Sequence, residues 1–463
     1  MSDRLHAFSD DVLAEHDAVA IAELVRTGRL GAEEVARAAI ERAARVTGLN
    51  GVVHDVYDNP RFGDPAAPLY GVPTFVKDNT DVAGLPTNHG TDAYVARPAK
   101  ADGPYARQFM ATGVTVLGKS ALPEYGLNAS SEFMTREPVR NPWHLEYSIG
   151  ASSGGATALV AAGVVPIAHA NDGGGSIRIP AACGGLIGLK PSRGRHLDGP
   201  DARAMPVNVV SEGVVTRSVR DTAAFVVAQE DQWRNPALPP IGLVQGPARR
   251  RLRIGMVVES VTGAHTCPQT KAVLEHTASL LERQGHTIEP VSLPVDEQFV
   301  RDFVLYYGFL AMIASSTGKL KDRRYDRRKL DGLTLGLRAH GLRNLQRVPG
   351  MLRRLGRAGD RYARMFTRHE LILSPVLAHV TPKLGHLSPT VPFDELLDRL
   401  LAYVGFTPLH NAAGTPAISL PMGMSAEGLP VGIQLSAAYG DERTLLETAF
   451  ELEQLQAWPR IQD

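Results

Sequence analysis

The middle of the chain alternates between short apolar runs and small-residue turns, and this pattern constrains the fold more than any other feature. Between Tyr70 and about Gly246, β-branched runs at residues 114–117, 164–167 and 186–189 are separated by Ala-rich stretches and Gly-rich turns. Short strands that alternate with helices are typical of α/β proteins. We therefore predict an α/β fold around a mixed β-sheet.

The segments on either side extend this expectation. Apolar residues recur at helical spacing across residues 17–46, which predicts helices there. Residues 252–258 are typical of a buried strand, residues 270–284 of a helix, and residues 287–291 of a second strand. We expect these three to form a βαβ unit that follows the Gly-rich part.

Residues 298–368 have a different character, because they are both helical and basic. From Lys319 to Arg368 there are sixteen Lys or Arg residues and four Asp residues. One interpretation is a set of solvated helices packed over the core. The other is a cap over a site, which would favour anionic substrates or a membrane surface. The sequence leaves both open.

Composition excludes several classes of protein. Of the 463 residues, 44% are hydrophobic, enough for a sizeable core, and 49 Lys and Arg balance 49 Asp and Glu. This neutrality disfavours a nucleic-acid partner. Two cysteines, Cys183 and Cys267, cannot build a disulfide framework or a Cys-rich zinc module, and they fit a reducing compartment.

We expect neither an export signal nor a membrane-spanning segment in this sequence. The first seventeen residues are polar and acidic, and the apolar stretch at residues 156–170 is interrupted by Gly163 and Pro166. That stretch is too short to span a bilayer. We expect a cytoplasmic protein without stable membrane insertion.

Three segments carry candidate chemistry, and the first ends in a lysine. In Gly71-Val-Pro-Thr-Phe-Val-Lys77-Asp78 the lysine follows an apolar strand. Most lysines are surface charges, so this feature is weak by itself. Burial disfavours an ammonium, however, and a buried Lys77 would be a neutral amine able to act as a base.

The second segment is Ser148-Ile-Gly-Ala-Ser152-Ser153-Gly-Gly-Ala156, which leads into a helix-like run. A Gly/Ser-rich turn that opens a helix can bind an anion through its N–H groups. It has neither the P-loop pattern nor the dinucleotide fingerprint. An ordinary helix-entry turn is the alternative.

The third segment is Asn171-Asp172-Gly173-Gly174-Gly175-Ser176-Ile-Arg178-Ile-Pro180. Three consecutive glycines are entropically costly, and they suit a site where N–H groups converge on one point. An oxyanion hole with a serine beside it has this requirement. A glycine-rich loop with a surface serine is the alternative.

Together these segments resemble the amidase signature family of serine hydrolases. The likeness continues through Gly118-Lys-Ser120, Pro123-Glu-Tyr125, Gly188-Leu-Lys190-Pro-Ser192, Gly414-Thr-Pro416 and Gly428-Leu-Pro430-Val-Gly432-Ile-Gln434. The resemblance implies one amidase domain over residues 1–463, with a central mixed sheet covered by helices on both faces. Residues 70–246 would be the signature core that carries the catalytic residues, and residues 298–368 a helical cap.

The resemblance also implies roles. Ser176 would be the nucleophile, Ser152 a bridging serine after a non-proline cis peptide bond, and Lys77 the base. The backbone N–H groups of Gly173, Gly174, Gly175 and Ser176 would form the oxyanion hole. Ser153, Asp172 and Arg178 would support the loop structurally. No metal or cofactor is implied.

Substrate contacts follow from the same resemblance. Gly126, Leu127 and Asn128 would face the acyl pocket, with Leu127 as an apolar wall and Asn128 as a polar handle. Three positions depart from the family pattern: Ala151, Asn171 and Gly173. Neither Asn171 nor Gly173 is expected to touch the three catalytic residues.

The chain is most similar to the branch with 6-aminohexanoate-cyclic-dimer hydrolases and related bacterial amidases, through residues 173–180 and 190–195. This implies small neutral or apolar amides, anilides or oligoamides, hydrolysed through a seryl acyl-enzyme. The alternatives are a carbamate or ester hydrolase with the same three residues, a glutamine-dependent amidotransferase subunit, and a non-catalytic membrane-surface protein. A homodimer is compatible with the resemblance.

Overall fold

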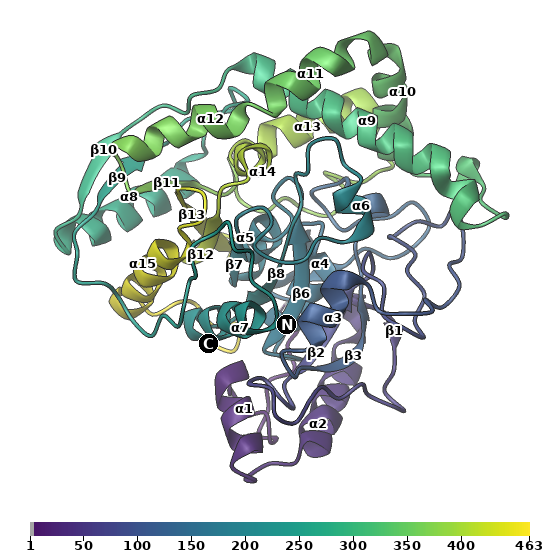
Figure 1. Cartoon of the computed structure of the whole chain (residues 1–463), viewed down its shortest axis with the longest axis vertical. Coiled ribbons are helices and arrows are strands. Elements are labelled where there is room, and N and C mark those ends of the chain that lie inside the picture. Colours follow the sequence, from purple (N-terminus) through teal and green to yellow (C-terminus); the bar gives the residue numbers. More distant parts are fainter. Residues whose placement is uncertain (1–3) are drawn as a thin grey trace.

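A computed structural model describes residues 4–463 of the protein. Met1 to Asp3, which begin the polar N-terminal stretch, and the side chain of Lys321 lie outside the description. Within residues 4–463 the largest sheet has eight strands, in the order β10-β9-β11-β13-β12-β7-β8-β6 (Figure 1). The strands are β6 (Ile167–Asp172), β7 (Ile187–Lys190), β8 (Ser211–Thr216), β9 (Arg253–Met256), β10 (Thr287–Pro290), β11 (Leu371–Pro375), β12 (Ala417–Met424) and β13 (Pro430–Ala437).

The sheet is mixed, as predicted. Strand β9 runs parallel to β10 and β11, while the pairs from β11 through β13, β12, β7 and β8 to β6 are antiparallel. Helix α8 (Pro268–Arg283) connects β9 to β10. This confirms the βαβ unit, because a parallel pair requires such a crossover.

A second, smaller sheet lies beside β6. It has the order β1-β3-β2, formed by β1 (Val52–Asp55), β3 (Thr115–Ser120) and β2 (Pro73–Lys77). Two side-chain hydrogen bonds join β2 to β6: Thr74 Oγ1 donates to the Ile167 carbonyl at 2.9 Å, and the Lys77 N–H donates to His169 Nδ1 at 3.1 Å. The end of β2 is thereby fixed next to the end of β6.

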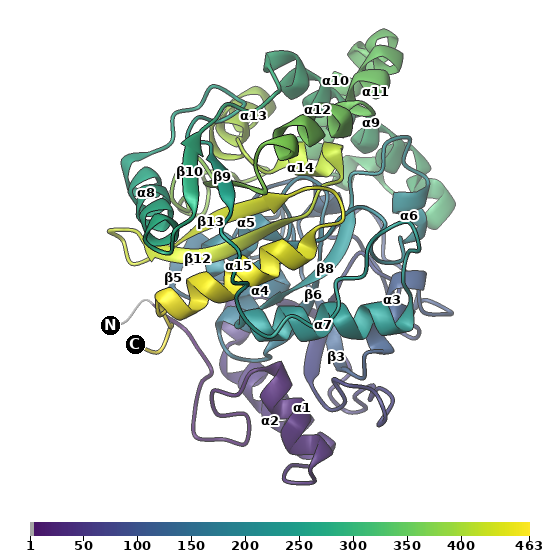
Figure 2. The same cartoon turned by 60° about the vertical axis from the view of Figure 1, so that its left-hand side comes forward.

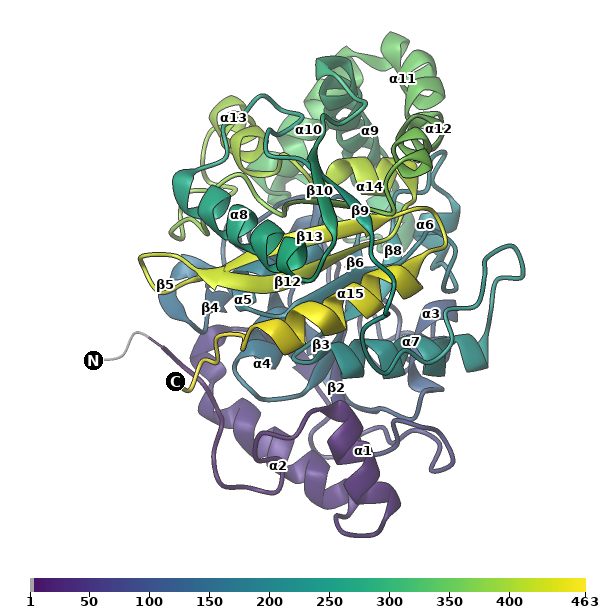
Figure 3. The ribbon, with the colours of Figure 1, turned by 90° about the vertical axis from the view of Figure 1, so that its left-hand side faces the viewer.

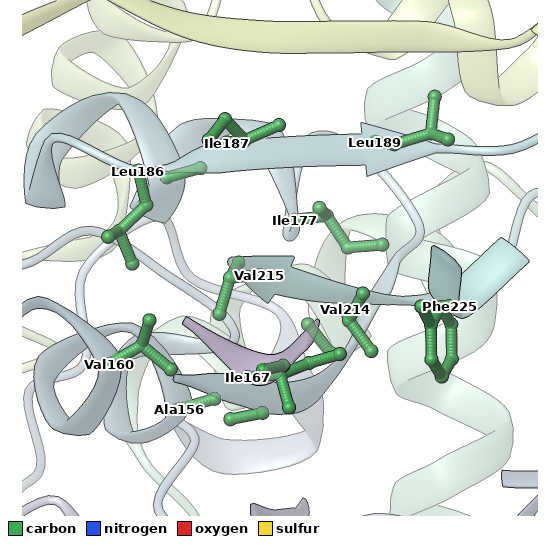
Figure 4. Packing of buried hydrophobic residues seen from close by; sticks show 14 of the residues in the cluster. Ala156, Val160, Ile167, Ile177, Leu186, Ile187, Leu189, Val214, Val215 and Phe225 are labelled. Carbon is green, nitrogen blue, oxygen red and sulfur yellow. The ribbon is translucent and has the colours of Figure 1, made fainter. Parts of the chain in front are cut away.

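Helices cover both faces of the large sheet. Helices α4 (Gly154–Ala161) and α5 (Arg178–Gly184) pack on one face, and α7 (Val219–Gln232), α8 and α15 (Glu442–Leu455) on the other (Figures 2 and 3). Between the layers, buried aliphatic side chains such as Val160, Ile177 and Val214 form the core (Figure 4). Burial of this apolar surface is the main stabilising contribution.

The predicted N-terminal helices are present as α1 (Ala18–Arg26) and α2 (Ala32–Arg45). The strand predicted at residues 164–167 begins only at Ile167, its last residue. Helix α4 ends at Ala161, Gly163 adopts φ +77°, and the Val164 N–H donates back to Leu159 O. These residues therefore close the helix. Pro166, which has no N–H, delays the strand further.

A helical layer covers one end of the molecule, at the top in Figure 1. It contains α9 (Glu297–Lys321), α10 (Gly332–Arg343), α11 (Val348–Leu355) and α12 (Ala358–Ala363), followed later by α13 (Phe393–Tyr403) and α14 (Pro408–Ala413). The region predicted at residues 298–368 is thus helical. Its role as a membrane-binding or anion-binding surface stays a prediction.

Small residues set the packing inside this layer. A Cβ at Gly308 of α9 would lie 2.9 Å from the Leu337 carbonyl oxygen, and one at Gly341 of α10 would lie 2.5 Å from the Gly308 carbonyl oxygen. The two helices therefore cross where both lack side chains. The Asp296 and Asp331 carboxylates cap α9 and α10 by accepting from the N–H groups of Phe299 and Thr334.

Helix α9 is long and apolar enough to cross a membrane by length and composition alone, over Glu297–Leu320. Such a segment is weak evidence for a membrane span, since core helices of soluble proteins share these properties. In this structure α9 packs against α10 and α11. The other short α-helices and strands are α3 (Pro104–Met110), α6 (Pro200–Arg203), β4 (Arg140–Asn141) and β5 (His144–Ser148). The structure also has the 3-10 helices η1 (Thr47–Leu49), η2 (Glu124–Gly126), η3 (Arg327–Lys329), η4 (Leu345–Arg347) and η5 (Arg364–Thr367).

Candidate active site

Lys77 is the last residue of β2, and its side chain is completely buried. Its Nζ lies 2.8 Å from Ser152 Oγ, 2.9 Å from Ser153 Oγ and 2.8 Å from Asn171 Oδ1. Burial lowers the pKa of Lys77 to about 7, against the opposing effect of the Glu212 and Asp172 carboxylates. A substantial fraction of this lysine is therefore a neutral amine at neutral pH.

Ser152 lies in the turn before α4, and the peptide bond between Ala151 and Ser152 is cis. Gly126 approaches this serine closely: its φ is +68°, and a Cβ there would stand 3.0 Å from Ser152 Oγ. Any side chain at position 126 would crowd the serine. Gly126 thus lies beside Ser152, and it also lines a cavity that is described below.

Ser176 follows β6, in the loop that leads into α5, and its side chain is 7% exposed. The preceding Gly175 has φ +135°, and a Cβ there would stand 2.6 Å from Ile179 Cδ1. Glycine is needed at this position for both reasons. Ser176 lines the same cavity as Gly126 and Ala151, so the structure brings the predicted loops together around one space.

Asp172 and Arg178 stabilise the loop at residues 173–177 by hydrogen bonds and an ion pair. Asp172 accepts hydrogen bonds from the N–H groups of Gly175 at 2.7 Å and Ile177 at 3.2 Å, and from Arg178 Nε at 2.9 Å. Burial by itself would raise the pKa of Asp172. The Arg178 guanidinium outweighs burial and holds that pKa well below its ordinary value. The Asp172 carboxylate is therefore a permanent acceptor for the loop.

This arrangement changes the expected oxyanion hole. The N–H of Gly175 donates to Asp172, so it is engaged within the protein. The N–H groups of Gly173, Gly174 and Ser176 have no acceptor within residues 4–463. Three of the four predicted donors thus have no internal acceptor among the described residues, and two of them, Gly174 and Ser176, line the cavity described below.

Asn171 corrects a second expectation, since it directly contacts one of the three predicted catalytic residues. Its Oδ1 accepts from Lys77 Nζ at 2.8 Å and from Asn79 Nδ2 at 3.2 Å, while its Nδ2 donates to Asn79 Oδ1 at 3.1 Å. The side-chain amides of Asn79 and Asn171 therefore hydrogen-bond to each other, and Asn171 Oδ1 also accepts from Lys77. The departure from the family pattern at position 171 was the available signal, but its contact depends on the pairing of β2 with β6.

Behind Lys77 lies a buried pair that sequence reasoning missed. His169 Nδ1 accepts from the Lys77 N–H, so its Nε2 carries the proton toward Glu212 Oε2 at 3.0 Å. Burial lowers the pKa of His169. A neutral imidazole therefore connects the lysine backbone to a buried carboxylate on β8.

The cavity beside Ser176 has a volume of about 690 Å³, including its opening to solvent. Its wall is mainly aliphatic and aromatic and comes from the signature core and the helical layer. The lining from that layer is Phe303, Val304 and Tyr307 of α9, Leu333 and Leu337 of α10, and Leu397, Leu400, Leu401 and Val404 of α13 and its end. No charged side chain lines it among the described residues.

Leu127 and Asn128 both line this cavity, as predicted. The Asn128 amide is also anchored to the backbone, and its role as a polar handle stays a prediction. Its Nδ2 donates to the Leu387 carbonyl at 2.8 Å, and its Oδ1 accepts from the Ala129 N–H at 2.8 Å. Because the Asn128 amide already has these backbone partners, it shapes the wall by fixing two segments of the chain.

The chain is similar to known proteins over nearly its whole length. A family model described as Amidase matches residues 54–446. A protein named AmiC from Mycobacterium leprae (strain TN) is 49% identical over 465 residues, covering 99% of both chains. A 6-aminohexanoate-cyclic-dimer hydrolase from Pseudomonas sp. (strain NK87) is 32% identical over 481 residues, covering 96% of this chain and 95% of that protein.

Solved structures give the same result. A 6-aminohexanoate cyclic dimer hydrolase complexed with substrate matches with a TM-score of 0.85 and 28% identity, covering 96% of this chain and 98% of that one. A bacterial aryl acylamidase of the amidase signature family shares the fold, with a TM-score of 0.82 at 24% identity and 96% of each chain covered.

These findings make the protein a hydrolase of carbon–nitrogen bonds in amides. The chain belongs to the amidase signature family and is an amidase.

Proposed function

We propose that this amidase cleaves amides through an acyl-enzyme on Ser176, with Ser152 as the bridging group and Lys77 as the base. The observation that carries the proposal is the buried Lys77 amine, 2.8 Å from Ser152 Oγ, beside the loop that presents Ser176. A serine hydroxyl is a weak nucleophile unless a base accepts its proton. Lys77, with a pKa of about 7, is suited to that task at neutral pH.

The proton route uses the two-way character of a hydroxyl. Ser176 Oγ attacks the carbonyl carbon and gives its proton to Ser152 Oγ, while Ser152 gives its own proton to Lys77 Nζ. Collapse of the tetrahedral intermediate breaks the C–N bond, and the same route in reverse protonates the departing amine. Water then repeats the cycle on the acyl-enzyme and releases the carboxylic acid.

Negative charge on the carbonyl oxygen requires hydrogen-bond donors in place before the reaction. The N–H groups of Gly173, Gly174 and Ser176 supply them, because the Asp172 carboxylate holds the loop and leaves these three without an internal acceptor. Asp172, Arg178 and Ser153 have supporting roles. Ser153 accepts from Lys77 and donates to the Asn171 carbonyl at 3.3 Å.

The preferred substrates are uncharged amides with an apolar acyl group. The cavity wall is aliphatic and aromatic, and its polar side chains among the described residues are uncharged. A charged group in this space would lose its hydration without a partner. Small apolar amides, anilides and oligoamides fit these conditions, and the similarity to a 6-aminohexanoate-cyclic-dimer hydrolase supports the oligoamides.

The test is a hydrolysis panel on purified protein: an aliphatic primary amide, an aryl anilide, a linear oligoamide, an aryl carbamate, a matched ester and glutamine. We expect turnover of the anilide or oligoamide that disappears in Ser176→Ala and persists in Ser260→Ala, a serine that bonds to Thr262. Faster turnover of carbamate or ester would identify that alternative, and turnover of glutamine alone would favour the amidotransferase alternative. Undiminished activity in Ser176→Ala would refute the proposed nucleophile.

A further inference from the structure

Tyr307 of α9 reaches from the helical layer to the loop that precedes Ser176. A Cβ at Gly174 would stand 3.2 Å from Tyr307 Cζ and closer still to the hydroxyl oxygen, and a Cβ at Gly173 would stand 3.8 Å from that oxygen. Residue 174 therefore cannot carry a side chain while Tyr307 keeps its place. The two glycines allow the hydroxyl to lie against the backbone that supplies the oxyanion donors.

Tyr307 lines the cavity, and its hydroxyl has no protein partner among the described residues. Its neighbour Tyr306 donates to the Val207 carbonyl, whereas Tyr307 has no such bond within residues 4–463. Tyr307 lines the cavity together with Gly174 and Ser176. A hydroxyl in this position is free to bond to a ligand, and a hydroxyl left without a partner in an apolar space is costly.

Two features keep this group a fixed donor. Burial, with the nearby Asp172 carboxylate adding to it, raises the pKa of Tyr307 above its ordinary value, so the hydroxyl keeps its proton. Its ring packs on Phe303 with centroids 5.0 Å apart, which limits its movement. The direction of the hydroxyl is therefore set before a substrate arrives.

We infer that the Tyr307 hydroxyl is a further oxyanion donor, which hydrogen-bonds the substrate carbonyl oxygen alongside the N–H groups of Gly173 and Gly174. The inference rests on the proposed function. The carbonyl oxygen of the amide under attack is the acceptor that fits, because the hydroxyl lies against Gly174 in the loop that supplies the oxyanion donors. The hydroxyl keeps its proton throughout, and the negative charge stays on the substrate oxygen.

The distinguishing variant is Tyr307→Phe, which keeps the ring and removes the hydroxyl. We expect kcat on an apolar anilide to fall by about 10- to 100-fold, with KM changed less than about twofold, because the bond strengthens as charge develops. A trifluoromethyl ketone with an apolar acyl chain forms a charged tetrahedral adduct with the serine. Its inhibition constant should weaken by a factor similar to the loss in kcat/KM.

Tyr306→Phe is the matched control, since it removes the neighbouring hydroxyl bonded to Val207. We expect it to lower thermal stability without the selective loss in kcat. An unchanged kcat in Tyr307→Phe, or a loss confined to KM, would overturn the inference and reduce Tyr307 to a wall residue. If the wild-type protein hydrolyses nothing in the panel and Ser176 does not react with a fluorophosphonate, the proposed function fails instead.

Discussion

Lys77 Nζ lies 2.8 Å from Ser152 Oγ, although the two residues are 75 positions apart and belong to different layers of the fold. Lys77 comes from the small sheet, and Ser152 from the turn that opens α4. The contact therefore depends on how the small sheet is attached to β6. It also places a titrating amine, itself buried, within hydrogen-bond reach of a hydroxyl.

This contact predicts the pH dependence of the reaction. Only the neutral amine accepts a proton, so kcat/KM should rise with pH through an apparent pKa near 7 and level off above it. Below the apparent pKa the rate should fall about tenfold for each pH unit. The measurement is kcat/KM on an anilide from pH 5 to 9. A flat profile, with chemistry shown to be rate-limiting, would contradict a lysine base.

Glu212 should set the position of that profile. Burial lowers the pKa of Lys77, while the Glu212 and Asp172 carboxylates raise it; neutral His169 lies between Glu212 and the lysine backbone. Glu212→Gln removes one negative charge and should move the rising limb to lower pH by on the order of one unit. At pH 6 the activity should then increase roughly fivefold.

Exposed Glu146, which pairs with Lys383, provides the control: Glu146→Gln should leave the profile in place. If the pH dependence of kcat/KM is unchanged in Glu212→Gln, the Glu212 carboxylate does not affect the pKa of Lys77. Loss of folding, monitored by circular dichroism, would be tested further with Glu212→Asp, which keeps the charge and should keep the profile.

Asn171 allows the opposite shift. Its Oδ1 accepts from Lys77 Nζ at 2.8 Å, so Asn171→Asp places a carboxylate oxygen against the amine without a change of shape. An adjacent negative charge favours the ammonium, and the rising limb should move to higher pH by about 1–3 units. The same titration of kcat/KM measures it. An unchanged profile would show that the side chain at position 171 does not face the lysine.

The buried Arg178–Asp172 pair should be decisive for stability. Removal of one partner from such a pair typically costs about 3–5 kcal/mol, and Arg178→Gln should lower the free energy of unfolding in urea by about that amount. Arg328→Gln breaks the exposed pair with Asp326 and should cost about 0–1 kcal/mol. An equal loss in the free energy of unfolding in the two variants would contradict a larger contribution from the buried pair.

The sign of the pH effect on that pair follows from Asp172, whose pKa is held below its ordinary value. The ionised Asp172 carboxylate stabilises the folded state fully only above the pKa of the unfolded carboxyl, which is about 4. This contribution to the free energy of unfolding decreases as the pH falls below that value. The difference in unfolding free energy between wild type and Arg178→Gln should therefore narrow in acid. If the difference in unfolding free energy stays constant down to pH 2, the destabilisation in Arg178→Gln comes from lost packing and not from the lost ion pair.

The apolar cavity predicts a dependence on acyl chain length. Each buried methylene contributes about 0.8 kcal/mol, so kcat/KM for a series of anilides should rise about fourfold per methylene until the cavity is filled. Leu400→Ala should reduce this gain for the longer acyl groups and leave acetanilide little changed. Leu342→Ala removes an exposed leucine of α10 and serves as the control. Equal rates along the series would contradict an apolar acyl site.

Much of the fold could be predicted from the sequence, because local patterns decide where strands and helices form. The βαβ unit around α8 and the helices α1 and α2 follow from periodicity. The strand predicted at residues 164–167 begins late because Gly163 and Pro166, both visible in the sequence, terminate the helix and delay the strand.

Residue types alone also singled out Lys77 and Ser176. A lysine after an apolar run and a serine after three glycines each imply a chemical environment: burial for the amine, and converging N–H groups for the serine. Both conditions are properties of the neighbouring chain. The structure adds Asp172, which takes the Gly175 N–H and so removes one predicted donor.

Tertiary structure decided the remainder. Three contacts depend on segments that are far apart in the chain. Asn171 bonds to Lys77, Asn128 bonds to the Leu387 carbonyl, and Tyr307 lies against Gly174. The sequence by itself determined which residues are able to do chemistry. Only the packing of the sheets and helices decided which of them meet, because side-chain contacts over a few ångströms are set by the whole fold and by no local pattern.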